Sequence, residues 1–241
     1  MSALRYSARI DRCTLLGPGS RAVIYVHGCC FSCKGCIASG FAAQEPIETS
    51  AQEMAQWFLS LTGCDGLTIS GGEPMLQPAY LAQVLRLCRE AGLHTAVDTA
   101  GCVPFASFEQ VLPWAELFLY DIKLWDEERH RAATGVSNRR ILENLDALTR
   151  AGADVYIRTP VIPTINDDLA ELSHIARFLA DLPGREHIRL IQLLPYHSYG
   201  VGKYATLGQS AKTTDIRPPE DAFMQQALRL YLDLDLPAQI S

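Results

Sequence analysis

Short apolar segments alternate with amphipathic helical segments along most of this 241-residue chain. Six segments are rich in aliphatic and β-branched residues and are bounded by turns, as buried parallel strands are. Between them, apolar residues recur with the spacing of a helix. This alternation predicts an α/β fold, with a parallel sheet covered by helices on at least one face. The predicted strands are 22–26, 66–70, 94–97, 117–120, 154–158 and 188–193, and the predicted helices are 50–61, 78–91, 107–112, 138–151, 168–182 and 219–232.

The composition limits the classes of function. The net charge is −6, and no stripe of Lys and Arg interleaved with aromatic residues is present, so nucleic acid is not an expected partner. No apolar run approaches the roughly 20 residues of a membrane span, and the first residues lack the pattern of a signal peptide. No interdomain linker or internal repeat interrupts the chain, so we expect a single domain over residues 1–241. Half of the eight cysteines are clustered, which favours a metal site in a reducing cytoplasm over a disulfide framework.

Four cysteines lie within eight residues, directly after the first predicted strand. Cys29, Cys33 and Cys36 have the spacing C-x3-C-x2-C, and no fourth cysteine follows at ligand spacing. A zinc site would need a second ligand pair, and a bacterial ferredoxin pattern starting at Cys30 would need a cysteine where the chain has Gly40. Three thiolates on a four-iron cluster leave one iron open to a small molecule. The spacing therefore favours a catalytic cluster, with Cys30 as a spare, packed thiol.

Unusual polar residues follow each of the other predicted strands. The carboxyl ends of parallel strands hold the working groups in such folds, so we expect these residues to face one site. Two glycines in the first group would let the backbone approach a ligand closely, and its glutamate could hold an ammonium group. The groups are Ser70-Gly71-Gly72-Glu73-Pro74, Asp98-Thr99, Asp121-Ile122-Lys123, Arg158 and Tyr196-His197.

Each of these groups also has a structural interpretation. The segment 70–74 could be a tight strand-to-helix turn and nothing more. Asp98, Thr99 and Asp121 offer oxygen ligands to a hard cation, but they could equally cap strands, or Asp121 could pair with Lys123. Position at a strand end favours a functional role for His197, whereas the other five histidines are interpreted as structural.

The cysteine spacing followed by Ser-Gly-Gly-Glu-Pro resembles the radical S-adenosylmethionine (SAM) superfamily. More closely, the chain resembles the activating enzymes of glycyl radical enzymes, of the pyruvate formate-lyase activating enzyme type. The similar segments extend over nearly the whole chain: Gly17–Arg21, the cysteine run, the segment 70–74, Asp98-Thr99, Asp121–Lys123, Thr134–Asn138, Tyr156–Arg158 and Leu193–His197. The resemblance implies a partial (β/α)6 barrel of the TIM type.

The resemblance also implies cofactors and roles. Cys29, Cys33 and Cys36 would hold a 4Fe-4S cluster whose fourth iron binds SAM. One electron passed through the cluster would split SAM into methionine and a 5′-deoxyadenosyl radical, which abstracts a hydrogen atom. The implied partners are a glycyl radical enzyme and, as electron donor, flavodoxin or ferredoxin. The residues implied to hold SAM are Gly35, Gly71, Gly72, Glu73, Asp121, Lys123, Arg158 and His197, with Lys123 and Arg158 as the catalytic pair and with Asp98, Thr99 and Asp121 as a monovalent-cation site.

Three positions depart from the family pattern. Leu16 stands where the family usually has Asp or Asn, Gly35 where an aromatic residue often packs near the adenine, and Ala38 where the activase of anaerobic ribonucleotide reductase has Asn. A radical SAM enzyme acting on a small metabolite or a peptide is therefore the alternative function. A non-catalytic iron–sulfur or zinc module is a further alternative, although it would leave the strand-end groups without a role.

Overall fold

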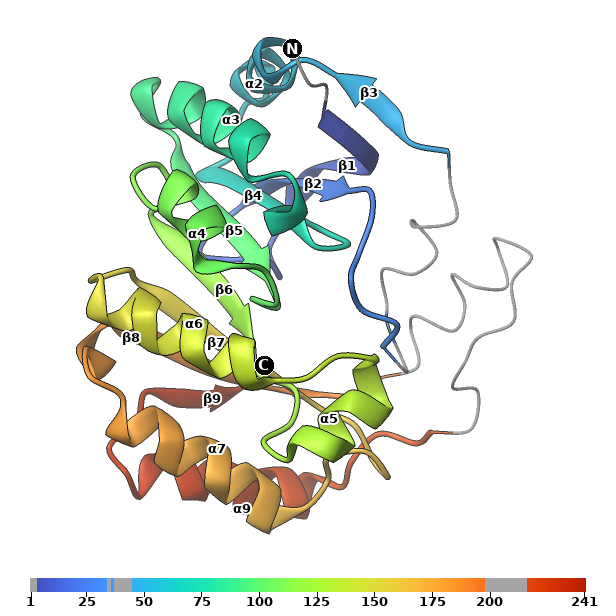
Figure 1. Ribbon diagram of the computed structural model, residues 1–241, viewed down its shortest axis with the longest axis vertical. Coiled ribbons are helices and arrows are strands. Elements are labelled where there is room, and N and C mark those ends of the chain that lie inside the picture. Colours follow the sequence, from blue (N-terminus) through green and yellow to red (C-terminus); the bar gives the residue numbers. More distant parts are fainter. Residues whose placement is uncertain (1–3, 34–35, 37–44, 198–215) are drawn as a thin grey trace. The chain divides into compact units, whose positions relative to one another are not determined.

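The computed structural model describes residues 4–33, 36, 45–197 and 216–241 (Figure 1). The chain forms two compact units, which are Met1–Cys30 with Phe41–Leu119 and Phe31–Gly40 with Tyr120–Ser241. Each unit has its own strands, helices and apolar core. Among the helices of the described residues, none has the length and apolar character needed to cross a membrane.

The first unit contains a sheet with the strand order β3-β1-β2-β4-β5. Neighbouring strands β2, β4 and β5 run parallel, whereas β1 is antiparallel to β2 and to β3. The register places Val26, at the end of β2, opposite Gly71, at the end of β4. The segments that follow these two strands therefore start side by side. The bounds are β1 Leu4–Cys13, β2 Arg21–Val26, β3 Ile47–Thr49, β4 Gly66–Gly71 and β5 His94–Thr99.

Helices α2, α3 and α4 lie along one face of this sheet (Figure 1). Ser50 and Glu53 form the predicted capping box at the start of α2, and Met54 and Phe58 of this helix are buried. A short 3-10 helix, η1 (Pro74–Leu76), begins directly after Glu73. The bounds are α2 Ala51–Ser60, α3 Pro78–Glu90 and α4 Phe105–Val111.

The second unit contains the parallel strands β7, β8 and β9, in that order. Helix α7 packs against α9, and α9 packs against β8 and β9. Strand β6 belongs to this unit only by its last residues, and the amide of Ile122, just after it, donates to the Arg158 carbonyl of β7. The bounds are β6 Leu117–Asp121, α5 Glu127–Thr134, α6 Arg139–Arg150, β7 Val155–Val161, α7 Leu169–Asp181, η2 Arg185–His187, β8 Ile188–Pro195, α9 Asp221–Leu232 and β9 Ala238–Ile240.

The predicted α/β fold with mostly parallel strands is confirmed, and each predicted strand and helix is present. Besides the two 3-10 helices, the sequence did not predict β1, β3, β9 and α5, because these segments have weak periodicity. Register shifts in β1 interrupt its alternation of apolar and polar residues. Helix α5 buries only His130 and Thr134, so it has no apolar stripe, and β3 and β9 have three residues each.

Candidate functional site

In the first unit, the segment after β4 lies against the end of β2. The amide of Gly72 donates to the Val26 carbonyl at 3.0 Å, and the amide of Glu73 donates to the Gly28 carbonyl at 2.9 Å. A Cβ on Gly72 would collide with that Gly28 carbonyl, and Gly71 has a φ of 123°. Glycine is therefore required at both positions, because the turn must touch the backbone that leads into Cys29.

The Glu73 side chain points into the first unit, with 1% of its surface exposed. Its carboxylate accepts the Thr99 hydroxyl proton at 2.6 Å and the amides of Met75 at 3.0 Å and Ala100 at 2.9 Å. Burial raises the pKa of Glu73 to about 7, although these three hydrogen bonds act in the opposite direction. The carboxylate thus fixes the turn after β4 to the segment after β5.

Asp98 and Thr99, at the end of β5, are both joined to the turn after β4. The Ser70 hydroxyl donates to the Asp98 carboxylate at 2.6 Å. The Thr99 hydroxyl donates its proton to Glu73 and accepts the Gly101 amide at 3.0 Å. The structure therefore brings together the predicted residues of β4 and β5. The Thr99 hydroxyl proton is used in the hydrogen bond to Glu73, so only the hydroxyl oxygen could contact a further group.

Cys30 is not the free packed thiol that the sequence predicted, because it forms a disulfide with Cys102. Cys30 follows the end of β2 and Cys102 follows the end of β5. These strands belong to one parallel run, so their carboxyl ends lie at the same edge of the sheet. The sequence favoured a metal site over a disulfide framework, and this pair is an exception to that expectation, whereas Cys29, Cys33 and Cys36 form no disulfide.

In the second unit, Lys123 and Asp121 form an ion pair, with 2.5 Å between Nζ and Oδ2. Burial acts to lower the pKa of Lys123, but the Asp121 carboxylate, Cys33 and Cys36 together outweigh it, and the pKa is raised. Burial raises the pKa of the Cys33 thiol, while the Lys123 ammonium acts to lower it. Lys123 therefore remains a cation whose field reaches Cys33 and Cys36.

Two further predicted residues come from β7 and the segment after β8, and Arg158 lies within β7, three residues before its end, where the sequence predicted it at the strand end. Arg158 is half-buried in β7, and its carbonyl accepts the amide of Ile122 at 3.0 Å. His197 is exposed and comes two residues after β8. Gly35 lies outside the described residues. Within the described residues, no three Cys, His, Asp or Glu side chains are gathered as the ligands of a metal ion are.

Helix α5 supports the cysteine loop in the second unit, a role that sequence reasoning missed. The Ser32 amide donates to the Thr134 carbonyl at 2.8 Å, and the Phe31 ring meets the His130 ring edge-on. Gly135 ends α5 with a φ of 87°, and a Cβ there would lie 3.1 Å from the Ser32 hydroxyl oxygen. The sequence signal that could have predicted α5 is Gly135, because a glycine directly after a charged segment is typical of the end of a helix.

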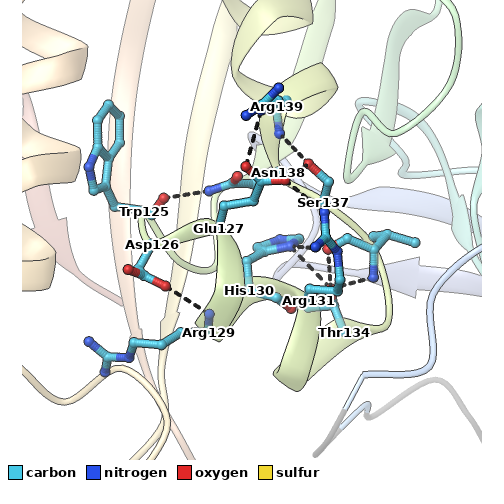
Figure 2. A network of polar contacts seen from close by, with 11 residues as sticks. Trp125, Asp126, Glu127, Arg129, His130, Arg131, Thr134, Ser137, Asn138 and Arg139 are labelled. Atoms are coloured by element: carbon cyan, nitrogen blue, oxygen red, sulfur yellow. Dashed lines mark hydrogen bonds and ion pairs between the residues drawn. The ribbon is translucent and has the colours of Figure 1, made fainter.

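A polar network fixes α5 in turn (Figure 2). Nδ1 of the buried His130 lies 2.7 Å from the Val136 carbonyl and 3.1 Å from the Thr134 hydroxyl. Glu127, in the first turn, pairs with Arg131 and Arg139. Burial lowers the pKa of His130, so the imidazole is neutral and its Nδ1 proton goes to the Val136 carbonyl.

The sequence matches known proteins over most of its length. A model of the radical SAM superfamily matches residues 23–179. The pyruvate formate-lyase-activating enzyme of Clostridium pasteurianum is 33% identical over 228 residues, which cover 90% of this chain and 91% of that protein. The isethionate sulfite-lyase activating enzyme of Nitratidesulfovibrio vulgaris is 44% identical over 168 residues, which cover 69% of this chain and 53% of the relative. The chain thus spans about half the length of this second relative.

A solved structure has the same fold. It is a domain of pyruvate-formate lyase-activating enzyme from Bacteroides vulgatus, with a TM-score of 0.62 and 33% sequence identity. The match covers 73% of this chain and 98% of that domain. The solved structures similar to this chain have the partial TIM-barrel fold, as the sequence predicted.

The buried carboxylate predicts a large effect of Glu73→Gln on stability. The side-chain nitrogen of Gln cannot accept a hydrogen bond. It must face either the Ala100 amide or the Met75 amide and Thr99 hydroxyl, so at least one buried N–H loses its acceptor. We expect the free energy of unfolding to fall by about 2 kcal/mol. Glu53→Gln, in the exposed capping box, should cost much less, because Gln also serves in a capping box. Equal losses in denaturant titrations would contradict this role of Glu73.

The neutral His130 predicts a pH dependence of stability. Its pKa is lowered in the folded protein, whereas the unfolded chain takes up a proton near pH 6.5. The unfolded state therefore binds more protons below about pH 6.5, and stability is lost as the pH falls through that value. His94, whose pKa is also lowered by burial, acts in the same direction. We expect His130→Asn to reduce this loss between about pH 7 and pH 5 in thermal melts, and an unchanged pH slope would contradict a neutral His130.

Proposed function

This chain belongs to the radical SAM superfamily, and we propose that it is an activating enzyme that installs a radical on a glycine of a partner glycyl radical enzyme. The observation that carries the proposal is the cysteine spacing within a chain that aligns with nine-tenths of a pyruvate formate-lyase-activating enzyme. We propose further that residues 1–241 act as one radical SAM domain. Flavodoxin or ferredoxin is the proposed electron donor. The proposed location is a reducing cytoplasm, because six of the eight cysteines form no disulfide and the Cys30–Cys102 pair is the exception.

The donor set fits a 4Fe-4S cluster. Cys29, Cys33 and Cys36 form no disulfide, and Cys29 is exposed while the other two are half-buried. The disulfide of Cys30 removes the fourth clustered thiol from competition as a ligand. Three thiolates would leave one iron for SAM. When bound, the cluster and SAM supply an electron and the 5′-deoxyadenosyl radical that removes a hydrogen atom.

The proposed work of the other residues is to bind and orient SAM. The backbone of Gly71 and Gly72 is the proposed contact for its methionine end, since no side chain stands there. Glu73 would contribute through the turn that it fixes, because its carboxylate already accepts three internal hydrogen bonds. The other proposed holders come from the second unit: they are Asp121, Lys123, Arg158 and His197, with Gly35 before the last cysteine.

The charged groups among these residues have distinct proposed roles. Lys123 stays protonated beside Asp121, so it can hold an anionic group of SAM without giving up its proton. Lys123 and Arg158 are the proposed catalytic residues. Asp98, Thr99 and Asp121 are the proposed ligands of a monovalent cation, since their carboxylate and hydroxyl oxygens suit a hard cation.

The cluster assignment predicts a sharp difference among cysteine variants. After anaerobic reconstitution with iron and sulfide, Cys29→Ala, Cys33→Ala and Cys36→Ala should each retain little iron and lose SAM cleavage. Cys88→Ala, at a buried free thiol outside the loop, is the matched control and should retain both. Cys30→Ala should also retain both. Iron assay and quantification of 5′-deoxyadenosine check this, and loss in Cys30→Ala with survival of Cys29→Ala would overturn the assignment.

The activase role predicts a radical on a second protein. We expect that mixing the reduced, SAM-loaded enzyme with its partner glycyl radical enzyme gives a glycyl radical signal in electron paramagnetic resonance. The partner's Gly-to-Ala variant at the radical site is the control and should give no signal. Formation of 5′-deoxyadenosine without any glycyl radical would instead favour an enzyme that modifies a small metabolite or a peptide, as the departures at Leu16, Gly35 and Ala38 allow.

A further inference from the structure

The loop between β7 and α7 contains a buried amide that joins two strand ends. Asn166 is 1% exposed, and its Nδ2 donates to the Lys123 carbonyl at 2.7 Å and to the Pro160 carbonyl at 2.6 Å. Its Oδ1 accepts the Ile162 amide at 2.6 Å. Both donors and one acceptor site of the side chain are used, all on backbone groups. A side chain of this kind fixes backbone positions and has no N–H left to donate to a ligand.

The same loop contains a strained residue. Thr164 has a φ of 68°, in the left-handed region that a β-branched residue rarely adopts. The loop is held by several contacts: the Thr164 amide donates to the Asp167 carboxylate at 2.7 Å, and the Arg129 guanidinium donates to the Ile165 carbonyl at 2.9 Å. Strain of this kind persists only where the surroundings over-determine the backbone, and it is concentrated at functional sites. The loop therefore keeps a costly conformation that places Asn166 beneath the strand ends.

The backbone that Asn166 holds includes Lys123 and is bonded to Arg158, two of the proposed SAM residues of the second unit. The amide of Ile122 donates to the Arg158 carbonyl of β7. The carbonyl of Lys123, the residue after Ile122, accepts from Asn166. The Lys123 ammonium forms an ion pair with Asp121, at the end of β6. Cys33, Lys123 and Asn166 also line one cavity of about 20 Å³, which is room for about one water molecule. A shift of the Lys123 backbone would therefore change the surroundings of Cys33.

We propose that Asn166 is the positioning residue that clamps the end of β6 to the end of β7 and so sets where Lys123 stands relative to Arg158. The inference rests on the proposed function for the claim that these two cations hold SAM. Asn166 acts through the backbone carbonyls of Lys123 and Pro160 and is not itself a catalytic residue.

Asn166→Asp tests the clamp, because it keeps the shape and the acceptor but loses both N–H donors. The matched control is Asn138→Asp. Asn138 is 3% exposed, and its Nδ2 donates to the carbonyls of Leu124 at 3.1 Å and Trp125 at 2.6 Å, the next two along the same segment (Figure 2). Both variants lose two buried donors to backbone carbonyls, so a general loss of stability should be similar. Only the first variant releases the Lys123 carbonyl.

Three measurements on the full chain separate the outcomes, two on the reconstituted protein and one on the cofactor-free protein. Iron content should equal that of the wild type in both variants. The dissociation constant for SAM, measured by anaerobic ultrafiltration, should rise about tenfold or more in Asn166→Asp and less than about twofold in Asn138→Asp, since one lost buried hydrogen bond is enough for a tenfold change. In the cofactor-free protein, exchange of the Ile122 amide should be about tenfold faster in Asn166→Asp than in Asn138→Asp.

Wild-type SAM affinity in Asn166→Asp, or equal effects in the two variants, would overturn the inference. If Asn166→Asp fails to fold, Asn166→Ser and Asn138→Ser, each with one hydroxyl donor, are compared in the same way. A wild-type protein that holds no iron or binds no SAM contradicts the proposed function instead. The exchange of the Ile122 amide then still decides whether the clamp exists, because that measurement needs no cofactor.

Discussion

The approach of the Gly72 backbone to the carbonyl of Gly28 is the constraint on which the first unit's strand ends depend. Parallel pairing sets Val26 opposite Gly71, so the next residues of both strands must pass each other at close range. Only a residue without Cβ permits this, and the backbone then forms two further hydrogen bonds there. Since Cys29 follows directly, the position of the first proposed cluster ligand is set by glycines 43 residues further along the chain.

Buried polar side chains fix the strand ends in both units, each through several hydrogen bonds. Glu73 joins the segments after β4 and β5, and Asn166 joins the ends of β6 and β7. Neither side chain is exposed, and an unpaired group in either place would cost about 1–3 kcal/mol. Such satisfied buried groups define one arrangement of the loops. These two side chains thus fix the backbone next to several of the residues proposed to hold SAM and the cluster.

The sequence predicts the repeated part of the fold well, because strand and helix periodicity is a local property. It also predicts that Gly72, Asp98 and Thr99 lie at strand ends, since that follows from parallel topology. It does not predict which way a polar side chain turns: Glu73 was expected to face a ligand and instead has three internal donors. The Cys30 disulfide and the role of Asn166 depend on contacts across 72 and 43 residues of sequence, respectively, which no local pattern records.

The central proposal is that three thiolates hold a cluster whose open iron is completed by SAM. Electron paramagnetic resonance of the reduced, reconstituted protein, recorded with and without SAM, tests it most directly. The account predicts that SAM changes the g-values of the cluster signal in the wild type and that no such signal forms in Cys33→Ala. Identical wild-type spectra with and without SAM would contradict it.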